Sequence, residues 1–388
     1  RDFCLSRGLG DVYKRQELHI MKILVGMSGG VDSSTTALLL KEQGHEVIGA
    51  TMAIWGKGGV YAEIQKKINS MPNKHSTHGA CFGPDEKEDI AAAEKICKEI
   101  GIEFHVFDCA KQYEEIVLNN FKKEYLSGRT PNPCIWCNSL IKFDVLPYLA
   151  KENGIEFDKF ATGHYARIEQ NENGRYILKQ GLSPNKDQSY FLYRLKQEQL
   201  ANIMLPLGSF SKDEIRNIAR SHGLEVAEKP DSQDFYEGDY NELLQVQPKK
   251  GNIVDMSGKI LGVHEGIWNY TIGQRKGIGI SAPEALYVVE LRKDTNEVVV
   301  GYKDATMKDE LIATKMNWIP FDNLDKEISC KAKIRSTQKP EPVTVKPLEN
   351  GNIEVHFENM QKSIAPGQSV VLYDGDVVLG GGIIDRVA

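Results

Sequence analysis

The sequence predicts an α/β protein in three parts: a doubly wound parallel sheet, a small central domain and a C-terminal antiparallel β-barrel. Up to about residue 162, short apolar runs alternate with amphipathic stretches. This alternation favours a parallel sheet with helices on both faces. Beyond Leu286 the chain has short alternating strands separated by turn signals such as Asp374-Gly375-Asp376. Such a pattern is typical of a small antiparallel barrel.

The elements of the predicted sheet follow one another in a regular order. Residues 22–27 form a buried strand, 33–43 a helix closed by Gly44, and 46–55 the next strand. Residues 56–80 show little periodicity and are expected to be a long loop. The remaining elements are helices at 85–100, 113–126 and 138–150 and strands at 103–108 and 159–162. Ligands of such sheets bind at the carboxyl ends of the strands.

Composition limits the class of protein. The 388 residues are enough for two or three domains of about 150 residues each. The hydrophobic fraction of 41% and charged fraction of 26% exclude disordered and collagen-like chains. No run of about 18 apolar residues occurs, so we expect no transmembrane helix and no membrane partner. Seven cysteines in so long a chain indicate a reducing, cytoplasmic environment rather than a disulfide scaffold.

We expect four segments along the chain. Residues 1–20 lack helical or strand periodicity and resemble a non-native leader, with Met21 as the natural start. Residues 21–235 would form the catalytic domain, 236–300 a central linking domain, and 301–388 the β-barrel.

A glycine-rich loop, GMSGGVDSS (residues 26–34), joins the first strand to the first helix. Adjacent glycines permit close approach of a ligand to the backbone, and free N–H groups at a helix start attract anions. The loop lacks the lysine of a Walker A motif and is not a dinucleotide GxGxxG. SGGVDS in this context resembles the PP-loop of ATP pyrophosphatases. That resemblance implies attack at the α-phosphate of ATP, with Asp32 helping to hold Mg²⁺.

A cysteine pair lies in GRTPNPCIWCN (residues 128–138), between two predicted helices. Cys137 at a helix start would have a lowered thiol pKa, because the positive end of the helix favours thiolate. Such a thiolate can be a nucleophile, a persulfide carrier or a metal ligand, and zinc would need a second pair that the sequence lacks. Cys81 is a third candidate, with a buried structural thiol as the alternative.

Together these motifs resemble the tRNA-specific 2-thiouridylase family over nearly the whole chain from Met21. Further matching segments are ATGHYAR (161–167), NKDQSYFLY (185–193), YTIGQRKGIGI (270–280) and APGQSVVLYDGDVVLGGGII (365–384). The resemblance implies a PP-loop domain, a central domain and a tRNA-binding barrel. It implies ATP-dependent adenylation of the wobble uridine O2 of tRNA, followed by replacement with sulfur to give 2-thiouridine, AMP and pyrophosphate.

The resemblance also assigns residues. Cys137 matches the family's first cysteine, the nucleophile, and Cys134, which the family pattern lacks, is our second candidate for a catalytic cysteine. ATP would be bound by Gly26, Met27, Ser28, Gly29, Gly30, Val31, Asp32, Ser33, Met52 and Gly163. The tRNA would be contacted by Asn132, Pro133, Lys186, Asp187, Gln188, Arg335 and Ser336. The implied partners are tRNA and a sulfur donor, which could be a persulfide carrier, a cysteine desulfurase or sulfide.

Two departures from the family pattern leave the sulfur chemistry open. Cys134 stands where the family has Asp, and the segment from Asp231 to Gly238 lacks the usual second cysteine. Either Cys134 replaces that cysteine in direct persulfide chemistry, or Cys81, Cys134 and Cys137 hold an iron–sulfur cluster with one iron open to hydrosulfide.

Charge distribution bears on the partner. The net charge is −6, which excludes a wholly basic nucleic-acid-binding surface. Segments 122–142, 179–196 and 249–276 nevertheless combine a local excess of cations with Tyr and Phe, as RNA-binding surfaces do, although solvated helix faces would look similar. The alternative function is a PP-loop enzyme that adenylates another tRNA base or a small amide or acid. We expect residues 303–388 to be needed for tRNA binding but not for nucleotide binding.

Overall fold

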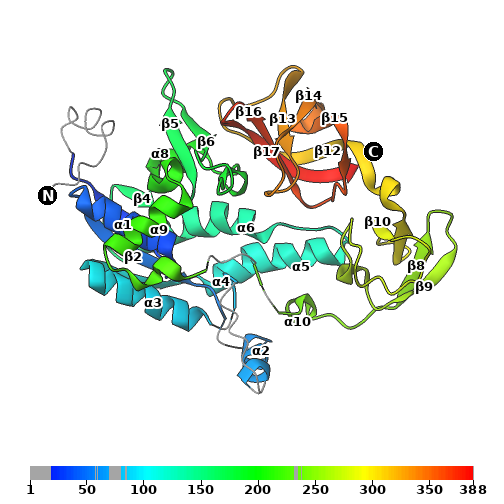
Figure 1. Cartoon of the computed structure of the whole chain (residues 1–388), viewed down its shortest axis with the longest axis horizontal. Helices are drawn as coiled ribbons and strands as arrows, with labels where there is room; N and C mark the ends of the chain where they lie inside the picture. The colour runs from blue at the N-terminus through cyan, green and yellow to red at the C-terminus, as the bar shows by residue number, and fades with distance from the viewer. Residues whose placement is uncertain are drawn as a thin grey trace.

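The computed structural model describes residues 19–387, apart from 57, 59, 70–79, 84, 231–234 and 237. Figure 1 shows the parallel-sheet domain on the left, the C-terminal barrel at the upper right and the central β-domain at the lower right. Helices α5 and α6 run between them. Within the described residues, no helix is both long and apolar enough to cross a membrane.

The parallel sheet has the strand order β3-β2-β1-β4-β7 and confirms the predicted doubly wound fold. Its strands are β1 (Lys22–Gly26), β2 (Glu46–Ala53), β3 (Glu103–Asp108), β4 (Lys159–Ala161) and β7 (Ile203–Met204). Ile23 and Val25 pack with the first and third helices, whereas Leu24 packs into the core on the opposite face. Alternate residues of one strand therefore face two helical layers.

Two groups of helices cover the sheet. Helix α1 (Val31–Glu42) packs against both α3 (Glu86–Ile100) and α9 (Lys212–Ser221). The second group is α4 (Ala110–Tyr113), π-helical η2 (Glu114–Leu118), α5 (Asn119–Leu126), α6 (Pro133–Trp136), π-helical η3 (Cys137–Val145) and α7 (Leu146–Glu152). The helix that carries the cysteine pair thus begins at Pro133, five residues earlier than predicted, because proline is well suited to a first helical position.

The predicted loop at 56–80 contains a helix, α2 (Val60–Asn69), so that expectation is wrong for ten of its residues. Tyr61 and Ile64 lie three residues apart on one face of α2 and are buried. The Tyr61 ring packs edge-on against Trp55, with centroids 5.2 Å apart. Tertiary packing therefore outweighs the weak local pattern of Gly, Asn and Lys. Residues 70–79 of the expected loop lie outside the described residues.

The central sheet contains the first two strands of the alternating pattern beyond Leu286, although the expected central segment, 236–300, already included nearly all of their residues. Its order is β10-β11-β8-β9, with β8 (Gly251–Asp255), β9 (Ile260–His264), β10 (Tyr287–Arg292) and β11 (Glu297–Gly301). Alternation predicts a strand but not its partners, so β10 and β11 could not be allotted from sequence.

The terminal barrel closes because β12 pairs with both β15 and β17. Its strands are β12 (Met307–Trp318), β13 (Ile328–Lys333), β14 (Glu341–Pro347), β15 (Ile353–Lys362), β16 (Ser369–Asp374) and β17 (Val377–Val387). The long strand β12 was not predicted. A hairpin of β5 (Ala166–Gln170) and β6 (Tyr176–Gln180) extends the same sheet through the Val377–Lys179 pair, which connects the barrel to the parallel-sheet domain. The remaining α-helices of the described chain are α8 (Gln197–Asn202) and α10 (Tyr240–Leu244).

Candidate active site

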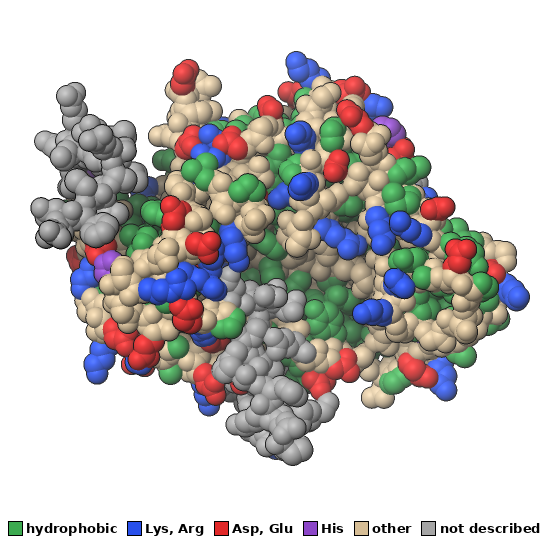
Figure 2. All heavy atoms as spheres, in the orientation of Figure 1, with side chains coloured by type: hydrophobic (Ala, Val, Ile, Leu, Met, Phe, Trp, Pro, Cys, Tyr) green, Lys and Arg blue, Asp and Glu red, His purple; other side chains and the backbone are tan. Residues whose placement is uncertain are grey.

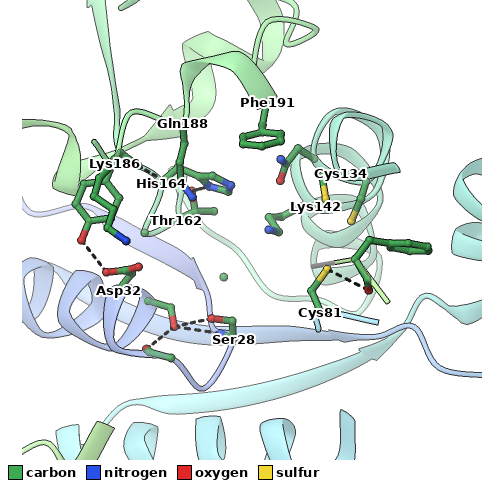
Figure 3. A pocket seen from close by; sticks show the side chains of 18 of the residues that line it. Ser28, Asp32, Cys81, Cys134, Lys142, Thr162, His164, Lys186, Gln188 and Phe191 are labelled. Atoms are coloured by element: carbon green, nitrogen blue, oxygen red, sulfur yellow. Dashed lines mark hydrogen bonds between the residues drawn. The ribbon is translucent and has the colours of Figure 1, made fainter. Parts of the chain in front are cut away.

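A cavity of about 990 Å³ lies at the carboxyl ends of β1, β2 and β4. Gly26, Met52 and Thr162 line its floor, where ligands of open α/β sheets bind. The cysteine-bearing helix lines the opposite side, and barrel residues 336–340 complete the boundary. Figure 3 shows Ser28 and Asp32 on one side of this space and Cys81 and Cys134 on the other.

The glycine-rich loop is held by its own hydroxyl groups. The Ser28 N–H donates to the Ser33 Oγ at 3.1 Å, and the Ser33 Oγ donates to the Gly30 carbonyl at 3.1 Å. Helix α1 begins directly after this turn, at Val31. The backbone N–H groups and serine hydroxyls at its start are therefore arranged to bind an anion such as a phosphate.

Two glycines of the site cannot be replaced without a clash. Gly29 has φ +69°, and a Cβ there would lie 2.6 Å from the carbonyl oxygen of Asp89. At Gly163 a Cβ would lie 2.8 Å from the backbone carbon of Asp32 and 2.9 Å from the nitrogen of Ser33. The strand-end loop at Gly163 therefore packs directly on the start of α1.

The Asp32 carboxylate is held by two side chains from distant parts of the chain. Lys212 Nζ lies 2.8 and 2.9 Å from its two oxygens, and the Tyr165 hydroxyl donates to Oδ1 at 2.7 Å. Lys212 is only 9% exposed. Asp32 is thus a fixed and charge-paired carboxylate at the edge of the cavity, and a Mg²⁺ ion would share it with Lys212.

Three thiols gather on the far side of the cavity, and we call Cys81, Cys134 and Cys137 the cysteine cluster. All three line the cavity, and the thiols of Cys81 and Cys134 hydrogen-bond to each other. The Cys81 Sγ also approaches the Phe235 carbonyl at 4.0 Å. The sequence analysis considered these three cysteines together as possible cluster ligands, and the fold places all three at one cavity.

The thiol pKa values differ from the sequence-based expectation. The hydrogen bond with Cys81, together with burial, raises the pKa of Cys134 well above its usual value. Burial raises the pKa of Cys137 to about 12, although the nearby Lys142 ammonium opposes the shift. The predicted lowering of the Cys137 pKa is therefore wrong, because Cys137 is half-buried and lies a full turn after the helix start at Pro133, so desolvation of the thiolate outweighs the helix terminus.

The cysteine cluster does not form a metal site in this geometry. Among the residues that the structure describes, no set of three or more His, Cys, Asp or Glu side chains is arranged to hold a metal ion. The three cysteines considered from sequence as ligands of an iron–sulfur cluster therefore lie near one another, but they are not arranged to coordinate a metal.

Two further groups lie between the glycine-rich loop and the thiols. Lys142 lines the cavity, and its charge partly offsets the raised pKa values of Cys134 and Cys137 and adds to the lowered pKa of His164. The His164 ring is paired with the Thr162 hydroxyl at 2.8 Å, and burial holds the pKa of its imidazole well below the usual value. His164, which lines the cavity, is therefore neutral.

The residues expected to contact tRNA occupy different environments. Lys186, Gln188 and Ser336 line the cavity. The Asp187 side chain is 1% exposed, and its carboxylate is paired with Lys333 at 3.3 Å. This carboxylate therefore holds two parts of the protein together. Arg335 donates to the Ser363 carbonyl at 3.0 Å.

The cavity collects most of the predicted site residues. Those that line it are Gly26, Met27, Ser28, Gly30, Val31, Asp32, Ser33, Met52, Cys81, Cys134, Cys137, Gly163, Lys186, Asp187, Gln188 and Ser336. Gly29 and Arg335 lie outside the lining, as do Asn132 and Pro133, which start the cysteine-bearing helix.

Sequence reasoning missed several charged residues of the site. Lys229 lies 2.8 Å from the Asp89 carboxylate and 3.3 Å from the Gly29 carbonyl. Glu86 accepts from the Ile54 and Trp55 N–H groups, and burial raises the pKa of its carboxyl. No local signal marks these residues, since each reaches the site from a separate element.

The fold and site define a nucleotide-binding class of protein. The model of the tRNA methyl transferase HUP domain matches residues 21–236, the tRNA methyl transferase PRC-barrel domain matches 242–302, and the aminomethyltransferase beta-barrel domain matches 308–384.

Curated relatives specify the family. A tRNA-specific 2-thiouridylase of Endomicrobium trichonymphae is 47% identical over 368 residues, covering 94% of this chain and 99% of that protein. One from Geotalea uraniireducens is 46% identical over 373 residues, covering 94% and 95%. The chain therefore belongs to the tRNA-specific 2-thiouridylase family. Among solved structures, the U34-tRNA thiolase of Methanococcus maripaludis with its [4Fe-4S] cluster has a TM-score of 0.34 at 20% identity and covers 58% of this chain and 65% of that one.

Proposed function

We propose that this protein is an ATP-dependent tRNA-uridine 2-sulfurtransferase that converts the wobble uridine of tRNA to 2-thiouridine. One observation carries the proposal: an anion-binding loop and a group of thiols line the same cavity of about 990 Å³. A nucleotide phosphate on the loop and a base between the loop and the thiols would bring phosphorus, oxygen and sulfur together. A cytoplasmic setting would supply both ATP and tRNA.

In the first step the uridine O2 attacks the α-phosphate of ATP, and pyrophosphate leaves. The N–H groups at the start of α1 and the Ser28 and Ser33 hydroxyls would bind the phosphates. Asp32 would hold Mg²⁺, which would neutralise phosphate charge. Lys186, Gln188 and Ser336 would contact the RNA from the cavity, and Asn132 and Pro133 would lie beside the target base.

In the second step a persulfide on one cysteine of the Cys134–Cys137 pair attacks C2 of the adenylated uridine, and AMP leaves. The other cysteine then attacks the protein-side sulfur of the new disulfide, which releases 2-thiouridine and forms a Cys134–Cys137 disulfide. A sulfur donor of the persulfide class loads the next sulfur after a thiol reductant has reopened the pair.

Cys81 supports a second version of the sulfur step. Cys81 contacts Cys134 and so adds a third thiol to the pair. Direct persulfide exchange between Cys134 and Cys137 needs only two thiols. An iron–sulfur cluster on the three thiols would need them to rearrange from the present geometry.

Basic side chains support the assignment of tRNA as substrate. Figure 2 shows lysine and arginine side chains around the hollow at the centre of this face, despite the net charge of −6. We propose that the barrel and the central domain contribute most of this basic surface. We also propose that the central domain begins at about residue 235 and that the barrel begins at about residue 300.

The test uses purified protein with unmodified tRNA, Mg²⁺-ATP and sulfide or a persulfide donor. Mass spectrometry of nucleosides should find 2-thiouridine, and the nucleotide product should be AMP with pyrophosphate. The Asp32→Ala variant should release neither. Formation of ADP, or AMP release that needs no tRNA and gives no thionucleoside, would refute the proposal in favour of another adenylating enzyme.

Cysteine variants separate the two versions of the sulfur step. Cys134→Ser and Cys137→Ser should stop thiolation and leave pyrophosphate release intact. Cys330, an unrelated thiol of the barrel, provides the control variant Cys330→Ser. Full activity of Cys81→Ser supports the cysteine pair alone. Loss of activity, together with loss of a broad visible absorption in anaerobic protein, supports a cluster.

A further inference from the structure

The segment that leads into the cysteine helix, residues 128–132, is bound to the C-terminal barrel. The Thr130 N–H donates to the Pro366 carbonyl at 2.8 Å, and the Gln368 amide donates to the Thr130 carbonyl at 3.0 Å. We call residues 128–132 the cysteine-helix leader and residues 365–368 the barrel turn. Both backbone groups of Thr130 are therefore satisfied by the barrel turn.

An arginine of the same leader reaches the last barrel strand. Arg129 Nη1 lies 3.1 Å from the Asp385 carboxylate, and Nη2 donates to the Ile384 carbonyl at 3.0 Å. Its Nε donates to Glu124 at 2.7 Å, which connects the same guanidinium to α5. Such a fork of charge-assisted bonds fixes orientation as well as distance.

The barrel turn is shaped for close approach. Gly367 has φ +92°, and a Cβ there would lie 2.8 Å from the Thr130 nitrogen. The two backbones are in contact with no side chain between them, so movement of one must displace the other.

We infer that the barrel turn and Asp385 position the cysteine helix for sulfur transfer, through Thr130 and Arg129. Pro133 starts that helix three residues after Thr130, and Cys134 follows at once. The inference rests on the proposed function and deepens it. The barrel would keep the thiols in register with the adenylated uridine, so that sulfur rather than water takes the activated carbon.

A second joint between the same two domains provides the matched control. Asp376 of the barrel pairs with Arg167 at 2.5 Å and with Lys179 at 3.3 Å. This joint lies on the β5–β6 hairpin and does not touch the cysteine-helix leader. Asp376→Asn therefore removes an ion pair similar to that of Arg129 with Asp385 and weakens the attachment of the barrel. It has no direct effect on the cysteines.

The experiment measures AMP and 2-thiouridine in the same reaction for wild type, Arg129→Gln, Gln368→Ala, Arg129→Lys and Asp376→Asn. Misplaced thiols should leave AMP release nearly intact and slow thiolation by roughly 10- to 100-fold in Arg129→Gln, because reacting groups displaced by about 1 Å lose that much rate. Water would then return uridine and AMP from the adenylate, so the AMP-to-thiouridine ratio should rise. Arg129→Lys should recover part of the coupling, and Asp376→Asn should retain it.

Hydrogen exchange of the peptide covering residues 129–137 gives a readout independent of activity. Exchange should be faster in Arg129→Gln and Gln368→Ala and unchanged in Asp376→Asn. An unchanged product ratio in both Arg129→Gln and Gln368→Ala, or equal uncoupling in Asp376→Asn, would overturn the inference. If wild type forms no 2-thiouridine, the proposed function fails, and the exchange data alone decide whether the barrel holds this segment.

Discussion

Burial determines when the Cys137 thiol can react. In the free protein its pKa is raised to about 12 by burial. A thiol with an ordinary pKa reaches its full alkylation rate near pH 9 to 10, since the thiolate is the reactive form. We predict that iodoacetamide alkylation of Cys137, followed by peptide mass spectrometry, keeps accelerating above pH 10.

The direction of this shift also sets a pH effect on stability. Because the folded-state pKa of Cys137 is above that of the unfolded chain, its contribution to folding is complete below about pH 8.5 and is lost as pH rises toward 12. A plateau of the Cys137 alkylation rate below pH 9 in metal-free protein would contradict the assigned burial.

The tight packing around Gly163 gives a second prediction. The Gly163→Ala variant places a methyl group within 3 Å of the Asp32 and Ser33 backbone, and overpacking of this kind costs about 1–3 kcal/mol. We expect a lower melting temperature and weaker Mg²⁺-ATP binding by calorimetry, because the start of α1 must shift. Gly58→Ala, where a Cβ meets nothing within 4 Å, is the control.

At the scale of elements, the π-helical segment η3 explains why Cys137 and Lys142 line one cavity. Hydrogen bonds in a π-helix join residues five apart, as the Leu146 N–H does with the Ile141 carbonyl. Residues five apart therefore lie over one another, and Lys142 follows Cys137 by five. An α-helical reading of residues 138–150 would place them on different faces.

This geometry predicts a role for the Lys142 charge in the sulfur step. The Lys142→Met variant removes the cation beside both cysteines, so anionic sulfur loses its stabilisation and thiolation should fall by roughly 10²-fold. Pyrophosphate release should change much less, and Lys142→Arg should be intermediate. Lys123→Met, an exposed lysine of α5, is the control. Equal loss of both products would show that Lys142 acts earlier, on the nucleotide.

Sequence patterns predicted the elements better than their partners. Strands β1 to β4, helices α1 and α3 and the glycine-rich loop were foreseen, because period and turn residues are local. Helix α2 and strand β12 were missed, and the strand pattern did not show which sheet β10 and β11 join. The Asp32–Lys212 pair joins residues 180 apart, and the Thr130–Gln368 contact joins residues 238 apart. No local pattern encodes such contacts, so the charged surroundings of the site emerged only from the fold.

On the scale of the whole molecule, the barrel and the catalytic domain share one core. Val371, Tyr373 and Val378 of the barrel pack in the same buried cluster as Tyr190 and Tyr193. The Tyr190 hydroxyl donates to the Ser369 carbonyl at 2.9 Å, and the Tyr193 hydroxyl lies 3.0 Å from the Ser369 Oγ. The barrel therefore shares buried contacts with the catalytic domain, and this packing argues against the untested expectation that nucleotide binding survives removal of residues 303–388.

We predict that a chain lacking residues 303–388 fails to fold cooperatively and binds Mg²⁺-ATP poorly. Truncation exposes the buried cluster and leaves two tyrosine hydroxyls without their partners, at a cost of about 1–3 kcal/mol for each polar group that stays buried. Near-UV circular dichroism melting and calorimetry would measure this. Ser369→Ala is the milder companion variant: it removes only the Oγ partner of Tyr193 and should lower stability by about 1 kcal/mol while nucleotide binding persists. A truncated chain that melts as sharply as the full one and binds Mg²⁺-ATP equally well would show that the shared core contributes little, and would restore the barrel as an independent tRNA-binding module.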